Sequence, residues 1–143
     1  MRVVLDANVV ISALITPQGA MAQVLDFWKQ GVYELVLSPA ILDEIARVAH
    51  YPRIQERYRL DDAQIDEFIR LLGEEATLIQ PSFRVQTVVE DPDDDRYVEC
   101  AVAAGADLIV TGDAHLLKLG DYQGIRMTKP GDFLLLLRLL PTG

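Results

Sequence analysis

The chain has 143 residues, half of them hydrophobic, which is enough for one domain with a sizeable core and excludes a disordered chain. Its net charge of −9 argues against tight nonspecific binding of nucleic acid, which usually needs a basic surface. A single cysteine, Cys100, excludes both a disulfide framework and a cysteine-based zinc site, so we expect one cytoplasmic domain covering residues 1–143.

Short apolar runs alternate with segments of helical periodicity along the chain. Strands are expected at residues 2–5, 33–38, 77–80, 107–113 and 125–128. Helices are expected at residues 20–31, from 39 onward, and at 61–76, 92–104, 114–120 and 130–140, while 8–15 is a helix or a turn and 81–89 a connection. This alternation predicts an α/β fold whose mostly parallel sheet is covered on both faces, with ligands beyond the carboxyl ends of the strands.

The apolar run FLLLLRLL at 133–140 is too short to span a bilayer, and the N-terminus shows no secretory signal, so we expect no membrane partner. The run is wider than one amphipathic stripe. It is either core throughout, or partly an interface for a second copy or another peptide.

Two of the expected strands end in an aspartate, Asp6 and Asp113, and both should therefore lie at the carboxyl edge of the sheet. Each alone is equally well explained as a helix N-cap, but two on separate strands of one sheet favour a shared site. Neighbouring polar residues could orient them through hydrogen bonds, namely Asn8, Ser12 and Thr111.

A third carboxylate comes from the helix that Ser38 and Pro39 begin. Asp43 and Glu44 both lie in its first turns, where the helix dipole favours negative charge without any further function. If the apolar stripe of this helix faces the core, Glu44 borders it while Asp43 faces solvent. Glu44 is therefore the better candidate for a site.

The run EDPDDDRYVEC at 90–100 concentrates acidic residues. Asp91, before Pro92, is a good N-cap, and Asp93 and Asp94 stabilise the first turn of a helix. Asp95 and Glu99 then lie one turn apart on the same face, where they repel each other unless a cation is near. We predict that Asp95 is the metal ligand and Glu99 an accessory one, with Asp94 the alternative to Asp95.

Together these residues predict a cluster of Asp6, Glu44, Asp95, Glu99 and Asp113. Carboxylates without lysine or histidine partners suit Mg²⁺ or Mn²⁺, which can activate water for attack on a phosphodiester. The sequence contains no phosphate-binding glycine loop and no serine-nucleophile elbow. His50 and His115 are isolated and form no zinc pattern. His115 follows Asp113 closely, so it lies either at the rim of the site or, as we expect, on a helix surface.

Residues 47–59 are locally basic, with four arginines against one glutamate and two interleaved tyrosines. One interpretation is a solvated helical face. The other is a rim that contacts RNA phosphates and stacks on bases, through Arg47, Arg53 and Arg57.

Four stretches resemble the PIN domain family: VVLDANVVISAL, SPAILDEIARV, DPDDDRYVECAVAAGADLIVTGDAHLL and IRMTKPGDFL. The resemblance covers nearly the whole chain and is nearest to toxin components of toxin–antitoxin systems, related to VapC-like ribonucleases. It implies a three-layer α/β/α sandwich and a metal-dependent nuclease for single-stranded RNA, with an antitoxin partner and a homodimer or higher oligomer. The family's acidic positions correspond to Asp6, Glu44, Asp95 and Asp113, with Asn8 and Thr111 in support.

Two other functions stay open at this point. The acidic net charge and leucine-rich C-terminus are compatible with a PIN fold that binds RNA or protein with little turnover. A phosphatase with Asp6 as nucleophile is disfavoured, because the D-x-D motif of such enzymes requires an aspartate at position 8, where this chain has Asn8.

Overall fold

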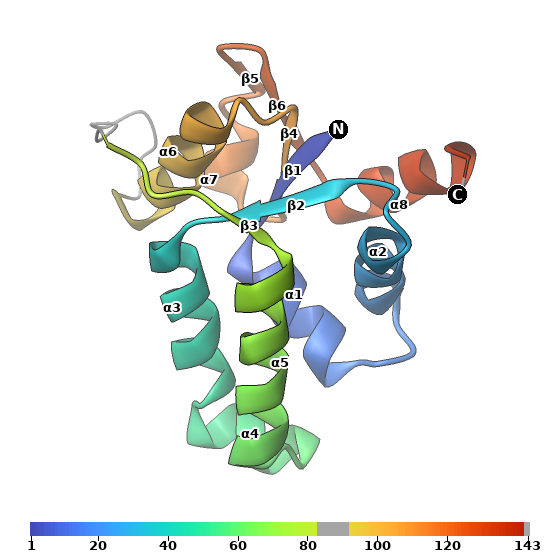
Figure 1. Cartoon of the computed structure of the whole chain (residues 1–143), viewed down its shortest axis with the longest axis vertical. Coiled ribbons are helices and arrows are strands. Elements are labelled where there is room, and N and C mark those ends of the chain that lie inside the picture. The colour runs from blue at the N-terminus through green and yellow to red at the C-terminus, as the bar shows by residue number, and fades with distance from the viewer. Residues whose placement is uncertain (83–91, 142–143) are drawn as a thin grey trace.

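The computed structural model describes residues 1–82 and 92–141 (Figure 1). The strands are β1 (Arg2–Leu5), β2 (Glu34–Leu37), β3 (Thr77–Leu78), β4 (Leu108–Val110), β5 (Asp121–Tyr122) and β6 (Ile125–Thr128). The α-helices are α1 (Ala7–Ile15), α2 (Ala20–Lys29), α3 (Pro39–Ala49), α4 (Pro52–Tyr58), α5 (Asp62–Glu75), α6 (Asp95–Ala104), α7 (Ala114–Leu117) and α8 (Pro130–Leu139), and a 3₁₀ turn at Pro92–Asp94 precedes α6.

Within the described residues, six strands form one sheet in the order β3-β2-β1-β4-β6-β5. The β1 strand lies inside this sheet and pairs in parallel with β2 and β4, so that Val4 is opposite both Val36 and Ile109. Among these strands β5 alone runs antiparallel, against β6. The predicted α/β fold with a mostly parallel sheet flanked by helices is thus confirmed.

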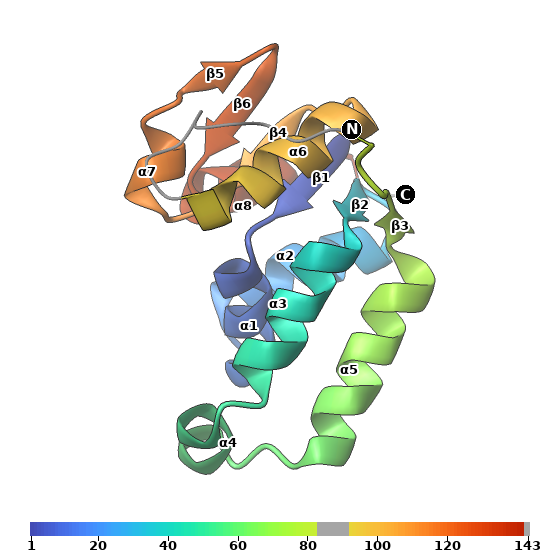
Figure 2. The same cartoon turned by 90° about the vertical axis from the view of Figure 1, so that its left-hand side faces the viewer.

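Helices flank the sheet in two layers, with α6 on one face and α2 and α8 on the other (Figures 1 and 2). The α3 and α5 helices pack against each other and project away from the sheet, with α4 at their far end (Figure 2). Since β1 and β4 are neighbours and parallel, the residues that follow them, Asp6 and Thr111, emerge side by side at one edge.

The core combines the inner strands with one side of the helices other than α4, which has no buried residue. Val3, Val4 and Leu5 are fully buried in β1, and Tyr33 meets Phe133 of α8 edge-to-face, with ring centroids 5.2 Å apart. The α8 helix is only partly core, because Leu135 and Leu139 keep 59% and 83% of their surface exposed. Among the described residues no single helix is long and apolar enough to cross a bilayer, and α1 and α2 approach that only as a pair bent by 102°.

Several boundaries differ from the prediction. Of the two alternatives for residues 8–15, the structure has the helix, α1, which begins one residue earlier and is capped by the Asp6 side chain accepting the Asn8 N–H. The expected helix over 92–104 is divided into the 3₁₀ turn and α6. The proposed cap Asp91, and most of the 81–89 connection, lie outside the described residues.

Two elements were not predicted from the sequence. The β5–β6 hairpin turns at Gln123 and Gly124, both with positive φ (52° and 84°), which is the pairing that a tight primed turn requires. The basic segment 47–59 is divided between α3 and α4 at Tyr51–Pro52, because proline cannot continue the hydrogen bonding of the preceding helix.

Candidate metal centre

Thr111 joins the aspartates at the ends of β1 and β4. Asp6 is only 5% exposed, and its Oδ2 accepts a 2.7 Å hydrogen bond from the Thr111 hydroxyl. The same hydroxyl oxygen accepts the backbone N–H of Asp113 at 3.0 Å. The expected orienting role of Thr111 therefore has a physical basis: one buried hydroxyl fixes Asp6 and the turn that carries Asp113.

Asp113 begins α7 and lies beside two further ligand-type side chains. Its Oδ1 accepts the backbone N–H groups of His115 (2.7 Å) and Leu116 (3.4 Å), as an N-cap does. One ligand atom each of Asp94, Asp113 and His115 lie within 4.8 Å of one another, close enough to share a cation. His115 is part-exposed, as expected of a helix surface, and it also borders the predicted site, which was the less favoured of the two positions that the sequence offered for it.

Asp94 and Asp95 are both buried at the start of α6. Asp94 takes the N-cap position, but its side chain makes no capping hydrogen bond. Its carboxylate therefore does not cap the helix start, which is the role expected for it from the sequence. Asp95 places its Oδ1 where no donor among the described residues reaches it. A buried carboxylate oxygen without a donor is unfavourable unless a cation offsets it.

The two neighbours thus share the expected role. The three-residue group contains Asp94 rather than Asp95, while a buried carboxylate oxygen that no donor among the described residues reaches occurs in both, Asp94 Oδ2 and Asp95 Oδ1. Glu99, the proposed accessory ligand, is half-buried one turn further along α6 and lies outside that group. Oxygen donors with one imidazole suit Mg²⁺ or, better, Mn²⁺, so the donor set and the unsatisfied oxygen both fit a divalent ion.

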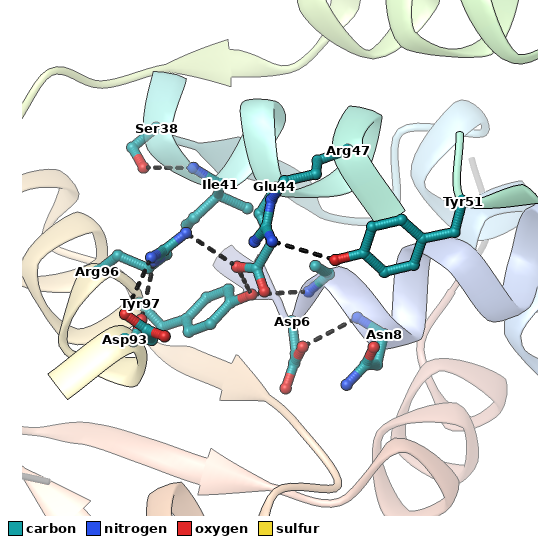
Figure 3. Close-up of polar contacts among 11 residues, drawn as sticks. Asp6, Asn8, Ser38, Ile41, Glu44, Arg47, Tyr51, Asp93, Arg96 and Tyr97 are labelled. Carbon is teal, nitrogen blue, oxygen red and sulfur yellow. Dashed lines mark hydrogen bonds and ion pairs between the residues drawn. The ribbon is translucent and has the colours of Figure 1, made fainter. Parts of the chain in front are cut away.

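Glu44, on α3, is held by two side chains of α6, Arg96 and Tyr97 (Figure 3). Its Oε1 accepts a 2.7 Å hydrogen bond from the Tyr97 hydroxyl and a 3.3 Å one from Arg96 Nη1. Arg96 in turn donates to the Asp93 carbonyl at 2.8 Å. Asp43, as expected, faces solvent, which leaves Glu44 as the α3 carboxylate directed toward the centre.

Tyr97 is buried with its hydroxyl between α1 and α3. Besides donating to Glu44, this oxygen accepts the backbone N–H of Ala7 at 3.2 Å. Burial, and then the nearby carboxylates of Asp6 and Glu44, raise the pKa of Tyr97 far above its ordinary value. The phenol therefore stays protonated and acts as a donor to Glu44.

The remaining candidates lie further out. Asn8 is exposed and supports Asp6 through its backbone N–H rather than its side chain. Ser12, on α1, lines a small surface pocket, and among the described residues its hydroxyl makes no hydrogen bond to a candidate ligand. Arg47 donates to the Tyr51 hydroxyl at 3.1 Å, one helical turn beyond Glu44 (Figure 3), and Arg53 and Arg57 are exposed on α4.

Arg96 and Tyr97 are the contributors that sequence reasoning missed. Both lie between Asp95 and Glu99, in the run chosen for its acidity. The available signal was the polar tip of a tyrosine in an otherwise apolar helix, because a buried tyrosine hydroxyl usually finds a partner. The identity of that partner depends on α3 packing beside α6, which the sequence alone does not reveal.

Comparison with known proteins identifies relatives by sequence and by fold. The sequence profile described as PIN domain matches residues 2–115. An uncharacterised protein of Methanocaldococcus jannaschii is 32% identical over 120 residues, which cover 84% of this chain and 76% of that protein. A chain in the crystal structure of VapBC2 from Rickettsia felis, bound to a DNA fragment from their promoter, superposes with a TM-score of 0.63 at 14% identity, covering 90% of this chain and 98% of the other. At 14% identity, the superposition on the VapBC2 chain shows a shared fold alone.

Proposed function

The chain belongs to the PIN domain family, and we propose that it is a Mg²⁺- or Mn²⁺-dependent endoribonuclease that hydrolyses phosphodiester bonds of single-stranded RNA in the cytoplasm. The observation that carries the proposal is the set of ligand-type side chains at the end of β4 and the start of α6. In it, Asp95 Oδ1 has no donor among the described residues, and Asp94, Asp113 and His115 lie within reach of one ion.

The residues proposed to hold the ion are Asp6, Glu44, Asp95 and Asp113, with Asp94 and His115 as further ligands. A bound Mg²⁺ or Mn²⁺ supplies Lewis acidity for activating water and stabilising the leaving oxygen. Thr111 fixes Asp6 against the Asp113 turn, so little reorganisation is needed when substrate arrives. A carboxylate of the cluster that is not engaged by the ion can accept the proton of the attacking water.

The test is a cleavage assay on end-labelled single-stranded RNA with Mn²⁺, with Mg²⁺ or with EDTA, comparing the wild type with Asp6→Asn. We expect cleavage that requires the ion and is lost in the variant. Equal cleavage in all conditions would indicate a contaminating nuclease, and no cleavage of varied RNAs would contradict the proposal. Calorimetric titration with Mn²⁺ distinguishes the alternative, a PIN-fold binding module, which needs no ion at this site.

For the substrate path we propose the basic surface of Arg47, Arg53 and Arg57. Arg47 is one turn from Glu44 on α3, and the Arg57 guanidinium lies 5.5 Å from the Tyr58 ring centre on α4. Arginines beside aromatic rings suit a single strand, because they contact phosphates while bases stack on the rings. This surface is local, which reconciles RNA binding with a net charge of −9.

We further propose that the protein is the toxin of a toxin–antitoxin pair and forms a homodimer or higher oligomer. The structural neighbour comes from a VapBC2 complex, and α8 exposes Leu135 and Leu139 while its other side packs in the core. Expression with and without the product of an adjacent small gene tests the pairing. Growth inhibition that this product relieves is expected, and unaffected growth contradicts the toxin role.

A further inference from the structure

The Tyr97 hydroxyl connects three elements of the candidate metal centre through one oxygen atom. Tyr97 itself belongs to α6, which begins with Asp95. Its oxygen donates to Glu44 of α3 at 2.7 Å and accepts from the backbone of Ala7, the residue that follows Asp6, at 3.2 Å. The start of α1 beside Asp6, the α3 helix that carries Glu44 and the α6 helix that begins at Asp95 are thus fixed relative to one another by a buried group that is not a proposed ligand.

The contact leaves Glu44 in a defined orientation. Among the described residues, the two donors to Glu44, from Tyr97 and Arg96, both use Oε1, so Oε2 is left for a cation. The Glu44 side chain is 23% exposed and would otherwise have several rotamers available next to water. Tyr97 is 2% exposed and has no such freedom, so it can impose one orientation on Glu44.

We propose that Tyr97 is a positioning residue of the metal centre, whose hydroxyl holds Glu44 and the start of α1 so that Glu44 and Asp6 face the same ion. The inference rests on the proposed metal site but not on the RNA substrate. Groups that orient ligands from behind typically change metal affinity 10- to 100-fold when removed. Tyr97→Phe deletes only the oxygen and leaves the packed ring in place.

The experiment is a double-mutant cycle read by Mn²⁺ affinity in calorimetry, with wild type, Tyr97→Phe, Glu44→Gln and the double variant. We expect Tyr97→Phe to weaken Mn²⁺ binding roughly 10- to 100-fold. In the Glu44→Gln background the same change should cost clearly less Mn²⁺ affinity, because only the contact with the start of α1 is then left to lose. Unchanged affinity in Tyr97→Phe, or an equal loss in both backgrounds, overturns the proposal.

The chain offers a matched control in Tyr33, which is buried and donates through its hydroxyl to the Val24 carbonyl at 2.8 Å, between β2 and α2. Tyr33→Phe therefore loses a buried hydrogen bond of the same kind away from the site, and it should keep wild-type Mn²⁺ affinity. If it weakens Mn²⁺ binding as Tyr97→Phe does, the effect is one of general stability and the proposal fails.

Three further outcomes are distinguishable. Should Tyr97→Phe not fold, Glu44→Asp withdraws the carboxylate from the phenol without altering Tyr97, and wild-type Mn²⁺ affinity in that variant contradicts the proposal. A wild type that binds Mn²⁺ but cleaves no RNA refutes the nuclease function while the cycle still reports on Tyr97. A wild type that binds no Mn²⁺ refutes both.

Discussion

The Thr111 hydroxyl donates to the carboxylate of Asp6 across neighbouring parallel strands, 105 positions apart in the sequence. It also accepts the Asp113 N–H, so a residue that is not among the proposed ligands sets the relative position of two candidate ligands. The hydroxyl is fully buried, which means that water cannot replace it if it is removed.

Thr111→Val is therefore expected to affect both folding and metal binding. The isosteric change leaves Asp6 Oδ2 and the Asp113 N–H without a partner, so the free energy of unfolding should fall by about 1–3 kcal/mol. Mn²⁺ affinity should fall about 10-fold or more. Urea unfolding and calorimetry measure the two effects. The control is Thr77→Val, which removes a 2.8 Å bond to Glu34 near the sheet edge and should leave Mn²⁺ binding unchanged.

Binding of a divalent ion is expected to stabilise the fold. Mn²⁺ at 100 times its Kd contributes about 2.7 kcal/mol, which for a chain of this size raises Tm by roughly 5–10 °C. Asp94→Asn and Asp95→Asn should each reduce this rise, and Asp43→Asn, on the solvent side of α3, should not. A variant at 94 or 95 that keeps the full rise identifies a residue that is not a ligand. Thermal unfolding with Mn²⁺ or EDTA gives the answer.

Cys100 is expected to be unreactive in the native protein. Burial raises the pKa of its thiol to about 12, with a Ser38 hydrogen bond opposing the shift in part. Because the folded state then holds the proton more tightly than the unfolded state, the stability from this group is complete below the ordinary thiol pKa and is lost as pH rises from there toward 12. Labelling with a chromogenic disulfide at pH 8 should be slow until denaturant is added, and rapid labelling of native protein would contradict this.

The sequence predicted the strand-end aspartates because parallel strands bring their carboxyl ends to one edge, a rule that needs only the strand assignments. It also separated Glu44 from Asp43, because the apolar stripe of α3 fixes which side of the helix is buried. Both of these inferences depend on local periodicity.

Contacts between distant elements were beyond the sequence. Asp94 and Asp95 differ by one position, so whether each carboxylate turns toward Asp113 depends on the 3₁₀ turn before α6, which periodicity does not specify. Tyr97 was passed over for a related reason: its partners Glu44 and Ala7 lie 53 and 90 positions away. The β5–β6 hairpin was missed because Gln123 is not a residue that usually signals positive φ.

The basic surface predicts a salt-dependent loss of RNA affinity. The measurement uses an Asp6→Asn background, in which RNA stays intact. There, Arg53→Gln combined with Arg57→Gln should weaken RNA binding. The slope of log K against log salt should become shallower by about 0.7 for each phosphate that an arginine no longer neutralises. Mn²⁺ binding, measured without the Asp6 change, should be unaffected, because α4 lies at the far end of the arm formed by α3 and α5 (Figure 2).

A matched control for this change is Arg70→Gln. Arg70 is exposed on α5 but already pairs with Glu67 and Glu74, so its charge is offset locally. Fluorescence anisotropy with labelled single-stranded RNA at several salt concentrations compares the variants. If Arg70→Gln lowers affinity and slope as much as the α4 pair does, the effect reflects net charge and the proposed rim is wrong.

The exposed leucines of α8 lead to a prediction on self-association. Burying a leucine side chain contributes about 1.5–3 kcal/mol, and Leu135 and Leu139 lie one turn apart, so they can be covered together. We expect the wild type to sediment as a dimer or larger species at micromolar concentration, and Leu135→Ser with Leu139→Ser to shift it to monomer. Leu78→Ser, at an exposed leucine on β3, should leave the assembly unchanged. A monomeric wild type contradicts an interface on α8, because there is then no association to explain. Dissociation by Leu78→Ser to the same extent contradicts it too, because the association would then not depend on α8.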